Sequence, residues 1–196
     1  MDEGLVKIRH AKSAKDFPGL KLEDNEYVEF AFKRTKLCLV AILAGVILSL
    51  AVIIVAFSLV LLNKNTLLDN MGINFINIIM VVLIATVLLA GLVGLIVYKG
   101  NRLYITNKHV INMIMKSPFA TSVNEIDLQS IEDASFRQDG ILQKMFHYGT
   151  FRLSTVGDET TYTFPYSDAS QEDLKAVSKL VSDAKKSKIT KEEKED

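Results

Sequence analysis

The sequence is short of cysteine, of net charge and, over its middle, of charged residues of either sign. Its one cysteine, Cys38, excludes an internal disulfide framework and any cysteine-rich zinc site. The 23 lysines and arginines balance 23 aspartates and glutamates. The chain therefore lacks the bulk electrostatic attraction that a dedicated nucleic-acid binder needs, and we expect no nucleic-acid partner.

Two runs of 26 residues, Leu37–Leu62 and Ile73–Tyr98, contain no charged residue. A bilayer core about 30 Å thick is crossed by roughly 20 helical residues. Backbone groups cannot stay unpaired in lipid, so each run predicts a transmembrane helix, and residues 63–72 predict a short extracytoplasmic loop. Residues 1–36 form a polar segment before the first run, which favours a retained span over a cleaved signal peptide.

Basic residues flank the two runs on one side only. We call these positions the basic collar: Lys33, Arg34, Lys36, Lys99, Arg102 and Lys108. By the positive-inside rule, both termini are expected in the cytoplasm. The collar either sets this topology alone or also orients the cytoplasmic part against anionic headgroups.

Small residues recur every four positions in both runs, which keeps them on one helix face. These positions are Ala41, Gly45, Ser49, Thr86, Ala90 and Gly94. An antiparallel hairpin would bring the two stripes together at the same depth, which predicts close helix packing, although the stripes could instead join two chains. Neither run contains Asp, Glu, Lys, Arg or His, so the hairpin is expected to be an anchor rather than a transport pathway.

After the second run the pattern changes to short strands at roughly ten-residue spacing, which is typical of an antiparallel barrel or sandwich. The expected strands are Asn101–Thr106, His109–Lys116, Thr121–Leu128, Ile131–Gln138, Gly149–Val156 and Thr160–Tyr166. Between two of them, Ile141–Tyr148 suits a short helical turn or loop. Asn107 and Lys108 suit a hairpin turn.

The C-terminal part predicts one helix that closes the strands. Ser167 is a candidate N-cap, and an apolar face follows at helical spacing from Leu174 to Val181. The charged tail, residues 188–196, is expected to be disordered.

Residues 26–33, within the N-terminal segment 1–36, alternate apolar and polar side chains. They predict a strand that completes the cytoplasmic sheet, with the membrane hairpin inserted after it. The rival interpretation is an amphipathic segment lying on the membrane.

No catalytic constellation occurs in the sequence. The histidines His10, His109 and His147 lack the spacing of a metal motif, and no phosphate-binding loop or nucleophile elbow is present. We expect no catalytic residue, no bound metal and no cofactor, and hence no enzyme.

Residues Arg102–Ile111 resemble the opening hairpin of bacterial pleckstrin-homology-like domains of the YdbS-like type, which are found beside membrane spans. Supporting matches follow in order at Ile126–Ile131, Gln143–Arg152 and Gly157. His109 and Lys144 stand where the family usually has Arg. The resemblance implies a strand barrel capped by one C-terminal helix over residues 99–187.

The expected whole is therefore a transmembrane helical hairpin plus a cytoplasmic PH-like domain in the plasma membrane of a prokaryote. The function expected from it is a non-enzymatic binding or scaffold module for a protein or lipid surface. The alternative is an accessory subunit of a membrane transport or envelope-stress complex, engaged through the hairpin. Expected partners are the lipid bilayer, anionic headgroups, and a protein partner or a second copy of the chain.

Overall fold

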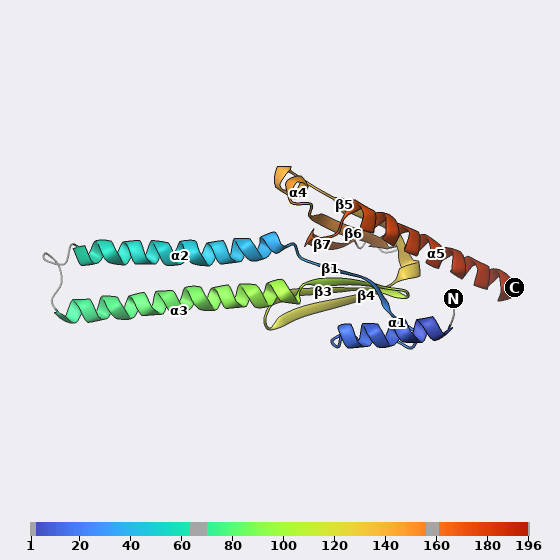
Figure 1. The fold of residues 1–196 in the computed structure, drawn as a ribbon, viewed down its shortest axis with the longest axis horizontal. Coiled ribbons are helices and arrows are strands. Elements are labelled where there is room, and N and C mark those ends of the chain that lie inside the picture. Colours follow the sequence, from blue (N-terminus) through green and yellow to red (C-terminus); the bar gives the residue numbers. More distant parts are fainter. Residues whose placement is uncertain (1–2, 63–69, 156–160, 196) are drawn as a thin grey trace. The chain divides into compact units, whose positions relative to one another are not determined.

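A computed structural model describes residues 3–62, 70–155 and 161–195 (Figure 1). The chain divides into two compact units. The first, here called the domain, comprises Met1–Thr35, Gly100–Lys116 and Ala120–Asp196. The second, the helical unit, comprises Lys36–Lys99 with Ser117–Phe119.

The helical unit contains α2 (Lys36–Leu62) and α3 (Asn70–Gly100). Both are long and apolar enough to cross a membrane, by length and composition alone. The helix α3 begins three residues before the predicted start at Ile73, so part of the predicted loop is helical. The rest of that loop, residues 63–69, lies outside the described residues.

The first sheet of the domain has the strand order β1-β2-β3-β4. Its strands are β1 (Val28–Lys33), β2 (Arg102–Thr106), β3 (His109–Ser117) and β4 (Ala120–Asp127). The segment with the N-terminal alternation is β1, and it pairs antiparallel with β2, Lys33 opposite Arg102. Because α2 and α3 lie between these strands in the sequence, the helical hairpin is an insertion between two neighbours in one sheet.

The second sheet has the order β5-β6-β7. Its strands are β5 (Ile131–Arg137), β6 (Gly149–Thr155) and β7 (Thr161–Ser167), with the short helix α4 (Ile141–Met145) between β5 and β6. The helical turn expected over residues 141–148 occurs as α4. Gly157, one of the positions that carry the resemblance, lies outside the described residues.

The sheets meet at one point and do not close into a barrel within the described residues. An isolated antiparallel bridge joins Arg34 to Ser167, and the Thr35 N–H donates to the Tyr166 carbonyl at 2.7 Å. On the other side, the 3-10 turn η2 (Leu128–Ser130) separates β4 from β5. The turn redirects the chain, so the predicted barrel or sandwich is two joined sheets.

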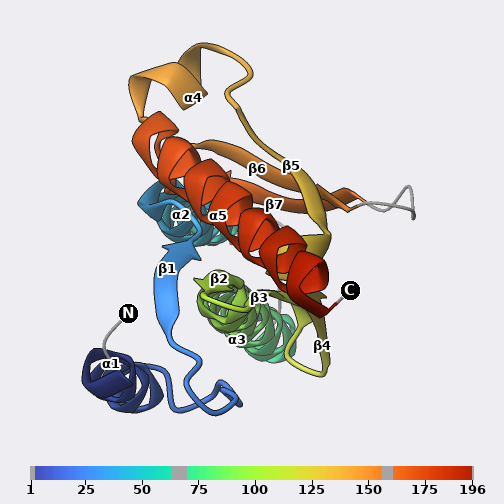
Figure 2. The same ribbon diagram turned by 90° about the vertical axis from the view of Figure 1, so that its right-hand side faces the viewer.

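Helix α5 (Gln171–Glu195) lies across the second sheet (Figure 2). Its buried residues Val177 and Val181 join a core to which both sheets contribute. The strand and turn residues of that core are Phe32, Leu103, Ile105, Val110, Ile126, Leu128, Ile131, Phe151, Leu153 and Phe164. Alternating inward side chains of the two sheets therefore share one apolar interior under a single helix.

The ends of α5 differ from the prediction. The cap is Ser170: its hydroxyl oxygen accepts from the Asp173 N–H at 3.1 Å, and Asp173 accepts from the Ser170 N–H at 2.8 Å. This is a reciprocal capping pair. The prediction that Ser167 caps this helix is wrong, because Ser167 is buried in β7 and its hydroxyl accepts from the Ala169 N–H. The tail expected to be disordered is helical as far as Glu195, since it is rich in Lys and Glu, which favour helix.

Helix α1 (Glu3–Asp16), which the sequence pattern did not reveal, lies against β1. The Ser13 hydroxyl accepts from the Val28 N–H at 3.0 Å. Past the helix end, the rings of Phe17 and Tyr104 meet edge to face at 5.2 Å. The start of β1 thus has a backbone donor that is satisfied by a helix rather than left as an open edge.

Strand directions give the domain two ends. At the linker end β1 finishes and β2 begins, and Gly149 of β6 lies opposite Ser167 of β7. At the turn end, Asn107 and Lys108 join β2 to β3, and the Leu128 N–H donates to the Lys108 carbonyl. The chain leaves for α2 and returns from α3 at the linker end.

Candidate functional site

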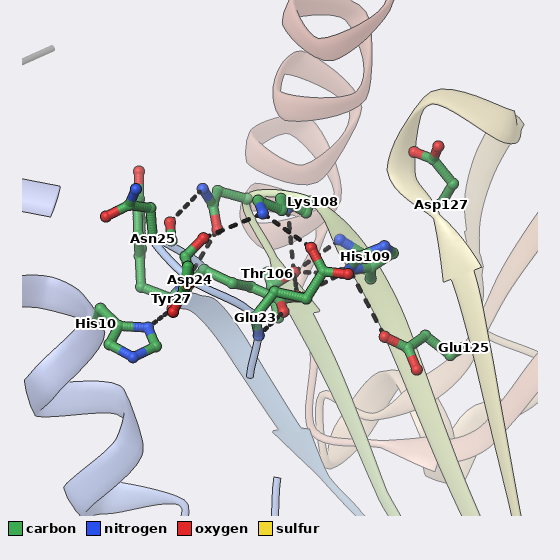
Figure 3. Close-up of polar contacts among 12 residues, drawn as sticks. His10, Glu23, Asp24, Asn25, Tyr27, Thr106, Lys108, His109, Glu125 and Asp127 are labelled. Atoms are coloured by element: carbon green, nitrogen blue, oxygen red, sulfur yellow. Dashed lines mark hydrogen bonds and ion pairs between the residues drawn. The ribbon is translucent and has the colours of Figure 1, made fainter. Parts of the chain in front are cut away.

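Polar side chains gather at the turn end of the domain, as Figure 3 shows. We call the group the polar cluster: Glu23, Glu26, Thr106, Lys108, His109 and Glu125. The N-terminal segment before β1, the β2–β3 turn and β4 each contribute to it. Residues far apart in the sequence therefore meet at one end of the first sheet.

Glu26 is the centre of the cluster, and its side chain is fully buried. The Thr106 hydroxyl donates to its carboxylate at 2.6 Å, and the Glu23 N–H donates at 2.8 Å. The His109 Nδ1 lies 3.1 Å from the same carboxylate. A buried carboxylate is tolerated only with such donors.

The pKa of Glu26 reflects two opposed effects. Burial acts to raise the pKa, because it penalises the charged form. Hydrogen bonds from Thr106 and from the Glu23 backbone, together with His109, outweigh burial and hold the pKa below its ordinary value of 4.5. The carboxylate is therefore ionised at neutral pH.

Lys108 closes the cluster on its exposed side. Its Nζ lies 2.8 Å from Glu23 Oε2 and donates to the Asp24 carbonyl at 3.1 Å. The hydrogen bond to Glu23 raises the pKa of Lys108. Beside it, the Asn107 side chain accepts from the Tyr27 N–H at 2.9 Å. The β2–β3 turn is thus fastened to the segment that precedes β1.

Glu23, Glu26 and His109 are the described residues that could hold a metal ion, with ligand atoms within 4.8 Å of one another. The same oxygens already have protein partners, because Lys108 neutralises Glu23 and three donors satisfy Glu26. The arrangement fits a fastening role for the cluster.

The predicted histidines have separate places. His109 is in the polar cluster, and His10 Nδ1 of α1 lies 2.6 Å from the Glu26 carbonyl oxygen. His147 is exposed in the connection after α4. Sequence spacing could not find the cluster, since its acidic members come from residues 23–26, far from the hairpin that holds His109.

The basic collar divides between the two ends. Lys33 and Arg102 lie opposite each other at the linker end, with Arg34 next to them. Lys36 and Lys99 belong to α2 and α3 of the helical unit. Lys108 is at the turn end and is held there by Glu23. The prediction grouped it by sequence distance, but β2 carries the chain away from the linker end before Lys108.

The predicted small-residue faces are largely exposed in the helical unit. Ala41, Ala90 and Ser49 are exposed, and a side chain added at Gly45 would meet no atom within 4 Å. The Ser49 and Thr86 hydroxyls each donate to a carbonyl of their own helix at 2.8 Å.

The contact between α2 and α3 uses a neighbouring face. A Cβ added at Gly91 would lie 2.7 Å from Val46 Cγ2, and one at Gly94 would lie 3.3 Å from Ile42 Cγ2. One residue turns a helix face by about 100°. These two glycine pairs lie close to the predicted register; Gly94 is one of the predicted small residues, and Gly91 is not.

No curated protein matches the chain. A solved structure of a DUF1696 family protein with a pleckstrin-homology domain, from Shewanella loihica PV-4, is similar at 13% identity. That similarity covers 43% of this chain and 70% of the other, with a TM-score of 0.31.

The model of the bacterial PH domain family matches residues 28–185. The matched range begins at β1 and ends within α5, so it takes in both sheets and the inserted helices. This confirms the resemblance found at Arg102–Ile111. Because the match spans more than half of the sequence, the chain belongs to the bacterial PH domain family.

Proposed function

We propose that this protein anchors a PH-like domain at the inner face of the plasma membrane, as a non-enzymatic binding or scaffold module. The supporting observation is the position of the insertion. The chain leaves the first sheet after β1, passes through two helices apolar enough to span a bilayer, and returns at the neighbouring strand β2. The domain would then be tied to the membrane by two adjacent strands.

In this proposal both termini lie in the cytoplasm, since the collar residues other than Lys108 flank the apolar helices at their domain side. The cytoplasmic part is the discontinuous domain formed by residues 1–36 and 99–187. The collar lysines and arginines other than Lys108 face anionic headgroups, where each adds about 1 kcal/mol of attraction.

A topology experiment tests the anchoring. In the Cys38→Ser chain, a single cysteine at Lys64 should react with a membrane-impermeant maleimide in intact cells. A cysteine at Thr161, on β7, should react only after the cells are opened. Labelling of Thr161→Cys in intact cells, or none of Lys64→Cys, would refute the proposed topology.

The turn end is the surface that we propose for a protein partner, because it is rich in exposed carboxylates. These are Glu23, Asp24, Glu125, Asp127, Glu132 and Asp133. Such a surface suits a partner with a basic face and speeds its association.

Purification of the full chain in mild detergent tests that surface. The double substitution Glu132→Lys and Asp133→Lys should release a co-purifying protein that binds the turn end. The control is Glu172→Lys, which makes the same kind of charge reversal at one exposed position, in the first turn of α5 at the linker end. A protein that still co-purifies with the double variant and with the control would contradict the proposed surface.

The second candidate is an accessory subunit that engages a larger membrane complex through the hairpin. An apolar pocket between α2 and α3, whose lining includes Phe57 and Met80, favours it. The exposed small residue Gly45 would let a further helix, including one from a second copy, approach closely. Gly45→Leu should then abolish co-purification or dimerisation, whereas Glu132→Lys should not.

A further inference from the structure

Exposed large apolar side chains of the domain and its turns are unevenly distributed. Away from α2 and α3, the described ones lie on α1 and β4 or at the linker end. Those at the linker end are Ile141, Leu142, Met145, Phe146 and Tyr166, and Phe119 lies on the β3–β4 turn beyond it. Large contiguous apolar surfaces on soluble domains usually mark an interaction site.

Two separate connections supply most of these side chains. Phe119 lies in the two-residue turn that joins β3 to β4, and it is 99% exposed. Ile141 and Leu142 of α4, which joins β5 to β6, are 84% and 60% exposed. Neither connection needs these residues for the core, which is built from the strands and α5.

Strand register places α4 at the linker end and the β3–β4 turn beyond it. Met113 of β3 lies opposite Arg102, and β3 continues past this pair to Ser117 before the turn that holds Phe119. In the second sheet, the pairing of Arg137 with Thr150 places α4 at the end where β7 finishes at Ser167. Ser167 bridges to Arg34, two residues before α2 begins.

Basic residues accompany the apolar ones. Lys116 near the end of β3 and Lys144 on α4 are exposed, and Lys33 and Arg102 lie on the adjoining strand ends. Apolar side chains beside lysines and arginines are typical of segments that lie in the headgroup region of an anionic bilayer.

We propose that the linker end is seated on the inner leaflet, with Phe119 and the apolar face of α4 inserted at the boundary between headgroups and acyl chains. The inference rests on the proposed membrane anchoring, because the chain enters and leaves the apolar helices at this same end. The bilayer is then the occupant of the surface, and the turn end is held toward the cytoplasm.

Quenching of a fluorescent probe by spin-labelled lipid tests the proposal in the full chain. Single cysteines are placed in the Cys38→Ser background at Phe119, at Ile141 and, as an alternative on α4, at Leu142. Each is labelled with bimane and reconstituted singly into nanodiscs of phosphatidylcholine with phosphatidylglycerol. The matched control is Thr161→Cys, an exposed strand residue at the turn end, and Leu48→Cys in α2 reports on the anchoring.

The probes at Phe119 and on α4 should be quenched about twofold more than the one at Thr161 by a nitroxide near the headgroup. A nitroxide at the end of the acyl chain should quench them less. Equal quenching at Phe119, α4 and Thr161, with Leu48→Cys quenched, would overturn the inference and leave the anchoring intact. No quenching at Leu48 would refute the anchoring itself.

Two other results would also overturn the inference. Quenching at only one of the two connections would contradict a common seat on the membrane. The probes could also be shielded only in nanodiscs that hold two chains, whether or not spin-labelled lipid is present. That result would assign the surface to a second copy of the chain.

Discussion

The two ends of the domain differ in which side chains have partners within the domain. At the turn end a fully buried carboxylate, Glu26, has donors from three directions, and Lys108 neutralises its neighbour Glu23. At the linker end Ile141 and Leu142 are 84% and 60% exposed, and neither belongs to the core. The turn end satisfies its groups internally, whereas the linker end leaves apolar surface for something outside the domain.

This difference separates stability from interaction. Changes to buried groups of the polar cluster should lower the free energy of unfolding of the domain, since the cluster fastens the segment before β1 to the β2–β3 turn. Changes to exposed groups at the linker end should leave the free energy of unfolding unchanged. Amide hydrogen exchange of the full chain in detergent measures these effects on the domain strands separately from the apolar helices.

Glu26→Ala should have the largest effect among the changes at the turn end. It removes the acceptor of the Glu23 N–H and one of the two acceptors of the Thr106 hydroxyl, which also donates to the His109 carbonyl at 2.9 Å. It also opens a cavity at a fully buried position, so that together these changes cost about 3 kcal/mol of unfolding free energy. The control is Glu125→Ala, whose carboxylate is 53% exposed and 3.6 Å from His109. The control should lose under about 1 kcal/mol. Equal losses at Glu26 and Glu125 would remove the contrast between buried and exposed members of the cluster.

Gly149→Ala tests whether the linker end also contains tightly packed backbone. An added Cβ would lie 2.5 Å from the Arg137 carbonyl oxygen and 2.6 Å from Phe136 Cζ. Because a backbone atom must move, we expect a loss of about 2 kcal/mol in protection of β5 and β6.

The matched control is Gly19→Ala, where an added Cβ would meet nothing within 4 Å. Its exchange rates should match those of the unmodified chain. A harmless Gly149→Ala would mean that β5 and β6 can separate at this end, and the linker end would be looser than its backbone contacts indicate.

Acid should weaken the turn end through Glu26. The pKa of Glu26 in the folded chain is below the ordinary 4.5. As the pH falls through 4.5, the unfolded chain takes up the proton first, so the stabilisation present at neutral pH declines and is gone below the folded pKa.

Glu26→Gln cannot titrate at this position and serves as the reference. Exchange protection of β1 and β2 should fall more steeply below pH 4.5 in the unmodified chain than in Glu26→Gln. Parallel curves would show that other carboxylates control the acid response.

The contrast between the ends also explains what the sequence could predict. Local alternation located β1 to β7, and the Asn107-Lys108 pair located the β2–β3 turn. The polar cluster depends on contacts between residues about 80 positions apart, such as Thr106 with Glu26, and no local pattern carries that information. Lys108 was misplaced for the same reason, because flanking position in the sequence does not reveal strand direction.

The packing face of a helix is harder to predict from the sequence than the position of the helix in the chain. Both apolar runs are uniform in hydropathy, so the small residues were the one visible cue to a packing face. The α2–α3 contact instead places Gly91 against Val46, about one residue around the helix from the predicted stripe. Ser167 failed as a cap because Ser170 and Asp173 form a complete capping pair three residues later.

The smallest effect on the free energy of unfolding should come from a substitution at the linker end. We compare the same change, leucine to alanine, at a buried and at an exposed position. Leu153 of β6 is 1% exposed, and Leu153→Ala should cost about 3 kcal/mol because it opens a cavity in the core. Leu142 of α4 is 60% exposed, so Leu142→Ala should change the unfolding free energy by less than about 0.5 kcal/mol. A loss at Leu142 that approached the loss at Leu153 would mean that the domain itself buries α4, and the apolar linker end would then belong to the fold. A small loss means that the fold does not need this leucine, as the proposed contact with the membrane requires.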